Sequence, residues 1–66
     1  MKVETENYEF DHGTKPRGTG LWAFDFGRRG AWTTEFAPHP MTYSQACAWA
    51  KKFAKQLGAD FIQVAS

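Results

Sequence analysis

Several features that define common protein classes are scarce or absent in this chain of 66 residues. Cys47 is the one cysteine, so no internal disulfide can form. No apolar run approaches the roughly 18 residues that a membrane-spanning helix needs. The start of the chain, Met1 to Glu6, lacks the apolar centre of a signal peptide. These absences predict a cytoplasmic protein with no membrane partner.

Neither sign of charge dominates, because eight Lys and Arg residues face seven Asp and Glu residues, for a formal net charge of +1. This balance disfavours both a strongly basic nucleic-acid binder and an acidic nucleic-acid mimic. His12, His39 and Cys47 do not form a cluster with the ligand spacing of a metal site. The pairing of Cys47 with His39 is the one nucleophile–base pair to consider, and a thiol packed as a small apolar group is the favoured interpretation. We expect no catalytic residues, no metal and no cofactor.

Aromatic residues, by contrast, make up 17% of the chain, enough to build a small core. Large residues alternate with small or polar ones in 21–26 and again in 31–36, the pattern of two strands with one buried face. The four Gly and Arg residues at 27–30 predict the turn of a β-hairpin. We expect the covered face to carry every second residue of both strands: Trp22, Phe24, Phe26, Trp32, Thr34 and Phe36. The other face is expected to meet solvent: Leu21, Ala23, Asp25, Ala31, Thr33 and Glu35.

The clearest local signal is a helix over 43–57. Thr42 and Gln45 have the spacing of a capping box, and Gly58 is placed to end the helix. An apolar stripe runs along one side: Tyr43, Ala46, Ala50, Phe53, Ala54 and Leu57, flanked by Cys47 and Trp49. Its small alanines suit close approach to an aromatic sheet face.

The remaining segments are predicted as an acidic edge strand over 2–10, a Gly-rich loop over 11–20 and a last strand over 60–65. The chain then forms a single α+β domain, residues 1–66, with the order β-β-β-α-β. We expect an antiparallel three-stranded meander plus a C-terminal strand, with one helix packed on one face of the sheet. A right-handed crossover would place the last strand beside the first and parallel to it.

Basic residues are the first candidates for a binding site. The meander predicts that the 27–30 turn, the N-terminus and the end of the helix share one end of the domain. This end would gather basic residues to bind an anion or a partner: Arg28, Arg29, Lys55 and Lys2, together with Lys51. Lys15, Arg17 and His39 would gather at the other end. Lys15 and Arg17 lie among glycines, where backbone N–H groups can form an anion-binding nest. Solvated charges at turns and at a helix end are the competing interpretation. Trp49 either completes the core or serves as an exposed aromatic anchor.

Three features give the chain a resemblance to a known type of domain: the spaced aromatics Trp22-x-Phe24-x-Phe26, the Arg28-Arg29-Gly30 turn with Phe36, and the helix pattern Thr42-x-x-x-Ala46-x-x-x-Ala50. Residues 20–58 resemble the small DNA-binding domains built from a three-stranded sheet and a helix, the AP2 type and the N-terminal arm-binding domains of phage-type tyrosine integrases. In those families the exposed sheet face enters the major groove. Here that face would present Asp25 and Glu35, whose charges oppose phosphate. The resemblance therefore supports the fold more than DNA binding.

These observations favour a small non-enzymatic interaction domain that binds a protein partner or self-associates, in the style of a phage or mobile-element accessory protein. The acidic first strand and the sheet edges are the expected contact surfaces, through strand addition or dimerisation. The alternative is a nucleic-acid-binding module that uses Lys15, Arg17, Arg28 and Arg29. A structural role in a larger assembly stays open.

Overall fold

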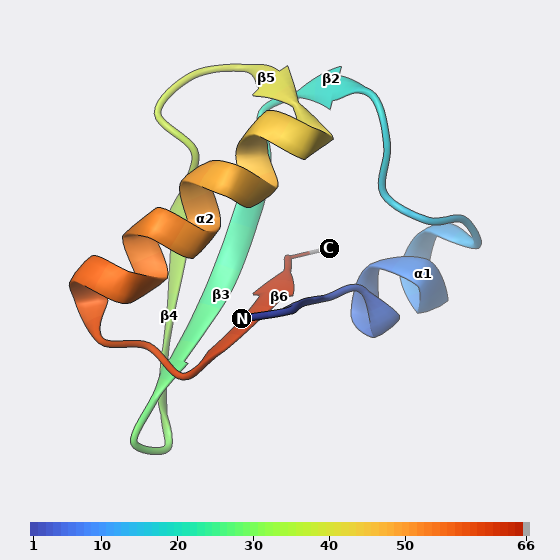
Figure 1. Ribbon diagram of the computed structural model, residues 1–66. Coiled ribbons are helices and arrows are strands. Elements are labelled where there is room, and N and C mark those ends of the chain that lie inside the picture. The colour runs from blue at the N-terminus through green and yellow to red at the C-terminus, as the bar shows by residue number, and fades with distance from the viewer. Residues whose placement is uncertain (66) are drawn as a thin grey trace.

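The computed structural model describes residues 1–65 and is built on a four-stranded sheet crossed on one face by a long helix (Figure 1). The strands lie side by side in the order β1 (Val3–Glu4), β6 (Phe61–Val64), β3 (Ala23–Arg28) and β4 (Ala31–Phe36). Strand β6 is parallel to β1 and antiparallel to β3, and β3 is antiparallel to β4. The α+β class is therefore as predicted, with a mixed sheet.

The long helix α2 (Tyr43–Leu57) forms where the sequence predicts it. The Thr42 side chain accepts a hydrogen bond from the Gln45 N–H, and the Gln45 side chain accepts one from the Thr42 N–H. Gly58 ends the helix in the left-handed conformation with φ 77°. The capping box and the glycine stop are both confirmed.

The core lies between α2 and the sheet face that carries Phe24, Phe26, Ile62 and Val64, all of which are completely buried. Three alanines of the helix stripe are also completely buried: Ala46, Ala50 and Ala54. Their small side chains let the helix come close to the sheet. Burial of this apolar surface is the main force that holds the two layers together.

The face predicted for 31–36 is wrong, because β4 turns Trp32, Thr34 and Phe36 away from the helix. Phe24 pairs with Glu35, and Phe26 pairs with Thr33. Residues directly opposite each other in an antiparallel pair share a face. The turn contains two loop residues, so even-numbered residues of β3 pair with odd-numbered residues of β4.

The strand predicted for 2–10 is also wrong beyond its first residues. Only Val3 and Glu4 join the sheet, and the segment continues as the short helix α1 (Glu6–His12). Contacts between residues four apart explain the helix: the rings of Tyr8 and His12 stack with centroids 4.0 Å apart, and Thr5 hydrogen-bonds to Glu9. Residues 1–65 therefore contain two helices instead of the one that was predicted.

The predicted three-stranded meander does not form, because β6 lies between β1 and β3. The last strand is beside the first and parallel to it, as predicted, but it also pairs with β3. Burial explains the arrangement: Ile62 and Val64 are completely buried at the centre of the sheet, and the acidic β1 takes the edge.

A small second sheet forms at the N-terminal end of α2 from the last residues of the predicted 11–20 loop and the two residues before the helix (Figure 1). Strand β2 (Thr19–Gly20) is antiparallel to β5 (Met41–Thr42). The Tyr43 N–H donates to the Gly18 carbonyl at 2.9 Å and ties this sheet to the helix. No helix within residues 1–65 has the length and apolar character needed to cross a membrane.

Candidate functional site

Strand β4 forms one border of the main sheet, and within residues 1–65 it pairs with β3 alone. The Ala37 N–H donates to the Trp22 carbonyl at 2.9 Å and extends the β3–β4 ladder. In an antiparallel pair, every second residue is hydrogen-bonded to the neighbouring strand. Because Ala37 is bonded to the residue opposite it, the odd-numbered residues of β4 are also bonded to β3. The N–H and C=O groups of Trp32, Thr34 and Phe36 therefore point outward. We call this row of groups the free edge.

The same three residues direct their side chains to the sheet face opposite α2, which we call the open face. Trp32 and Phe36 keep 57% and 61% of their surfaces exposed. The Trp32 ring meets the Phe61 ring edge-on, with centroids 5.2 Å apart. Gly27 lies beside both residues, and an added Cβ there would be 3.3 Å from atoms of the Trp32 ring. The glycine therefore leaves the space into which Trp32 packs.

A polar group lies between the aromatic residues of the open face. The Asp25 carboxylate accepts hydrogen bonds from the Thr34 hydroxyl and, at 3.0 Å, from the Gln63 amide. These bonds link β3 to both of its neighbours and hold the three side chains in a row across the strands. Because both carboxylate oxygens have partners, Asp25 serves as a structural hydrogen-bond acceptor. Its charge also disfavours phosphate on this face.

A small cleft of about 170 Å³ opens where the free edge passes the end of α2. Its lining is mainly apolar and consists of five hairpin residues and the last residue of α2: Phe26, Arg28, Ala31, Trp32, Thr33 and Leu57. The cleft is below the usual range of about 300–1,000 Å³ for small-molecule pockets. It is large enough for one side chain of a peptide that pairs with β4.

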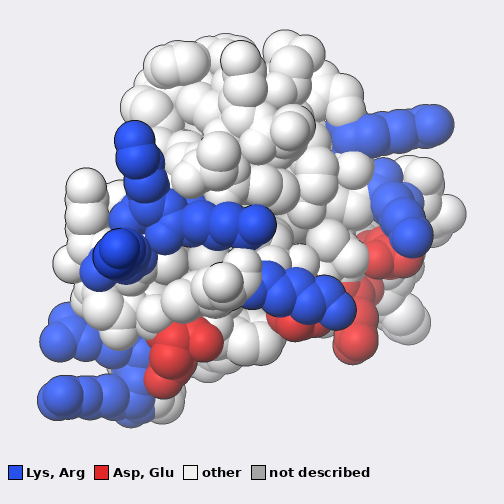
Figure 2. Space-filling model, in the orientation of Figure 1, with Lys and Arg blue, Asp and Glu red and all other residues white. Residues whose placement is uncertain are grey.

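Five basic residues form a group that we call the basic end: Arg28, Arg29, Lys51, Lys52 and Lys55. Figure 2 shows basic side chains gathered over the C-terminal half of α2 and the β3–β4 turn. The Arg28 guanidinium passes over Gly58, with Nε 3.7 Å from the position of an added Cβ. The turn and the helix end therefore meet as predicted, whereas Lys2, which was predicted at the same end, lines a hollow together with Lys15. Cations near the helix end also complement the negative end of the helix dipole.

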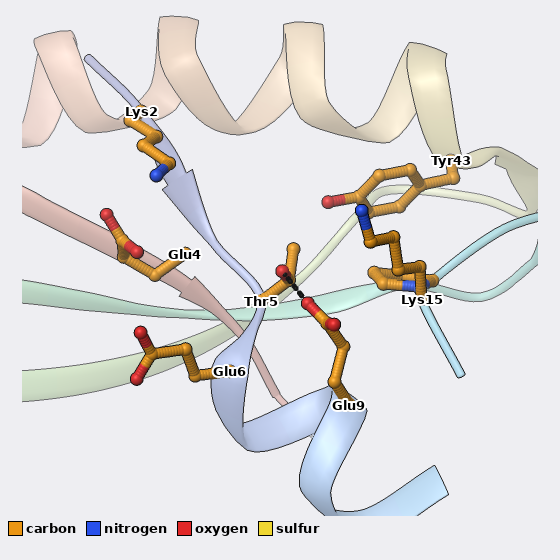
Figure 3. A pocket seen from close by; sticks show the side chains of 8 residues that line it. Lys2, Glu4, Thr5, Glu6, Glu9, Lys15 and Tyr43 are labelled. Carbon is orange, nitrogen blue, oxygen red and sulfur yellow. Dashed lines mark hydrogen bonds between the residues drawn. The ribbon is translucent and has the colours of Figure 1, made fainter. Parts of the chain in front are cut away.

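Lys15 and Arg17 lie elsewhere, on the segment that follows α1. Lys15 lines a shallow hollow of about 460 Å³ together with the half-buried Tyr43 (Figure 3). Three glutamates line the same hollow: Glu4, Glu6 and Glu9. Their charges oppose an anion beside Lys15. Across residues 1–65, no three His, Cys, Asp or Glu side chains are grouped closely enough to hold a metal ion.

The hollow contains the most perturbed titratable group of the described residues. Partial burial, followed by the neighbouring Cys47 side chain and the charge of Glu9, raises the pKa of the Tyr43 hydroxyl well above its ordinary value. The Tyr43 ring also packs edge-on against Trp22, with centroids 5.0 Å apart. Tyr43 therefore stays a neutral hydroxyl at physiological pH and contributes to packing.

Trp49 is half-buried on the flank of α2, with its ring stacked on Phe53 and packed against Phe24 and Phe26. The aromatic residues that reach solvent near the free edge are instead Trp32 and Phe36, which the alternation pattern predicted on the covered face. The length of the turn is the signal that could have identified them. With a two-residue turn, even-numbered residues of β3 share a face with odd-numbered residues of β4, so Trp32 and Phe36 cannot lie on the face that carries Phe24 and Phe26.

The chain matches no protein-family model, no curated protein sequence and no solved structure.

Proposed function

We propose that this protein is a small non-enzymatic interaction module that binds a protein partner by adding the partner's strand to the free edge of β4. The observation that carries the proposal is the row of outward N–H and C=O groups on Trp32, Thr34 and Phe36. An extended peptide can pair with such a row and extend the sheet by one strand.

The composition of β4 supports this function. Soluble proteins protect sheet edges with prolines, bulges or several charged side chains. Here Glu35 is the one charged residue in the strand, and the strand contains no proline. Two large aromatic side chains are exposed on the open face of the same strand. Main-chain pairing would supply affinity, and Trp32 and Phe36 would select partners with apolar side chains at every second position.

A variant that blocks the free edge tests the proposal. Thr34→Pro removes an N–H that points outward, so the main-chain hydrogen bonds of the β3–β4 ladder are kept, and the side-chain bond from Thr34 to Asp25 is lost. We expect a partner captured by the wild type to bind this variant at least about tenfold more weakly, since pairing then leaves a carbonyl of the partner without a donor.

Thr34→Val is the matched control, because it keeps the outward N–H of residue 34 and loses the same side-chain hydrogen bond to Asp25. This control should retain the partner, and circular dichroism should show that both variants are folded. Undiminished capture by Thr34→Pro, or a wild type that binds neither another protein nor a second copy of itself, would reject the proposal.

Nucleic-acid binding is a second candidate, favoured by the basic end. Lys55 lies in the last turn of α2 and Arg28 lies beside Gly58, however, and the helix dipole disfavours phosphate at this end. We expect affinity for a mixed-sequence duplex to be weak and to fall steeply as salt rises. The double variant Arg28→Ala, Arg29→Ala checks this candidate, because tight binding that survives both changes would require a different surface.

A further inference from the structure

We infer that the partner strand is β4 of a second copy of this chain, so that the protein forms a two-fold dimer through the free edge. The inference rests on the proposed function and identifies the strand that pairs with the free edge. The outward groups belong to three alternate residues of β4, and Thr34 is the middle one. The dimer follows from this symmetric arrangement.

A two-fold axis at Thr34 makes the free edge complementary to itself. Thr34 then lies opposite Thr34 of the second copy, and Trp32 lies opposite Phe36 in both directions. All three pairs are hydrogen-bonded positions, and each exchanges two bonds, so the seam contains about six main-chain hydrogen bonds.

This register also matches the faces of the two sheets. Paired residues share a face, so both α2 helices lie on one side and both open faces on the other. Trp32 of each copy meets Phe36 of its partner across the seam, and aromatic cross-strand pairs of this kind stabilise a sheet. A shift by one residue would place the open face of one copy beside the helix face of the other and would break the pairing of outward groups.

Charge favours the same register. Glu35, the one charged residue of β4, lies opposite Thr33 of the second copy. A shift by two residues in one direction would place the two Glu35 carboxylates directly opposite each other, and a shift in the other direction would pair Phe36 with Gly30 in the turn. The turns that carry Arg28 and Arg29 lie at opposite ends of the seam, so the two basic ends stay apart.

The dimer is expected to be weak. A seam of two six-residue strands is small compared with the roughly 1,200–2,000 Å² that stable protein interfaces bury. Sedimentation equilibrium over a wide concentration range should therefore show reversible monomer–dimer exchange in the wild type and a monomer for Thr34→Pro.

Cysteine cross-linking tests the register. In a Cys47→Ala background, Thr34→Cys places the two thiols on residues about 5.5 Å apart between Cα atoms, which is within disulfide range. Ala31→Cys is the matched control on the same exposed strand, where the register separates the two cysteines by about 20 Å. Under mild oxidation we expect Thr34→Cys to form covalent dimers at least about tenfold faster than Ala31→Cys, because its thiols are already in proximity.

The outcomes separate this inference from the function on which it rests. A wild type that stays monomeric at every concentration, or equal cross-linking rates at the two positions, overturns the dimer. If edge-dependent capture of another protein persists in that case, the proposed function stands. If Thr34→Pro alters neither self-association nor capture, both fail.

Discussion

Arg29 occupies a backbone conformation that its side chain does not favour. It lies with Gly30 in the two-residue loop of the hairpin, and the two residues have φ angles of 51° and 80°. Positive φ at both loop positions is the feature of a type I′ turn, which prefers Asn followed by Gly. Among the described residues, Arg29 is the one non-glycine residue with a positive φ.

Replacing Arg29 with Asn should therefore stabilise the protein. We expect Arg29→Asn to raise the free energy of unfolding by about 0.5–1 kcal/mol, because Asn tolerates the left-handed region better than Arg does. Urea denaturation measures the change. Arg28→Asn is the control, since it removes the same charge from a β3 residue outside the loop and should produce no gain. Equal effects of the two variants would attribute the change to charge instead.

Tyr43 should make the protein sensitive to alkaline pH. Burial raises the pKa of its hydroxyl in the folded state, whereas the unfolded chain titrates at the ordinary value of 10.0. The unfolded state therefore loses this proton first as the pH rises, so stability is unaffected below about pH 10 and falls above it. Denaturation as a function of pH should show the decline, and Tyr43→Phe should reduce it. A decline that is identical in both proteins would assign the effect to other groups.

At the scale of elements, α2 depends on its first turn. Thr42 and Gln45 satisfy each other's main-chain N–H groups, which would otherwise lack partners at the start of a helix. We expect Thr42→Ala to lower the free energy of unfolding by about 1 kcal/mol. Ser44→Ala changes an exposed neighbour in the same turn and should have little effect. Chemical denaturation compares the two, and similar losses would contradict a capping role.

The strands of the main sheet differ in how well they are protected from pairing with another chain. Strand β6 is central and buries Ile62 and Val64, and β1 closes one edge with an acidic residue. Strand β4 closes the other edge with exposed aromatic side chains and outward main-chain groups. This contrast is the basis for assigning binding to β4.

At the scale of the whole molecule, one helix on one sheet produces two layers, and the shortest of the three dimensions is 17 Å. A domain of this size has one thin core and a small margin of stability. Its integrity therefore depends on the fit between the alanine stripe of α2 and the buried aromatic residues of β3.

Enlarging an alanine in that stripe should destabilise the whole fold. Ala50 is completely buried against the sheet, whereas Ala48 is exposed on the same helix. We expect Ala50→Leu to cost about 1–3 kcal/mol through overpacking. Each kcal/mol corresponds to a decrease of about 4–8 °C in Tm for a domain of this size. Thermal unfolding should show little change for Ala48→Leu, and equal Tm values for the two variants would show that the layers are not tightly packed.

The amino-acid sequence by itself determined the elements whose signals are local. Thr42, Gln45 and Gly58 define α2 through hydrogen bonds and backbone preferences within a few residues. The alternation around Phe24 and Phe26 likewise indicates a buried strand, and the residues at 27–30 indicate its turn. These signals act between chain neighbours, so they can be identified without the fold.

The tertiary structure alone decided the features that depend on pairing between distant residues. The position of β6 between β1 and β3 follows from burial of Ile62 and Val64, which lie at the opposite end of the chain from β1. The exposure of Trp32 and Phe36 follows from the cross-strand register, which decides the face on which each side chain lies. Alternation within one strand shows that two faces exist, but the partner strand and the turn determine which face is buried.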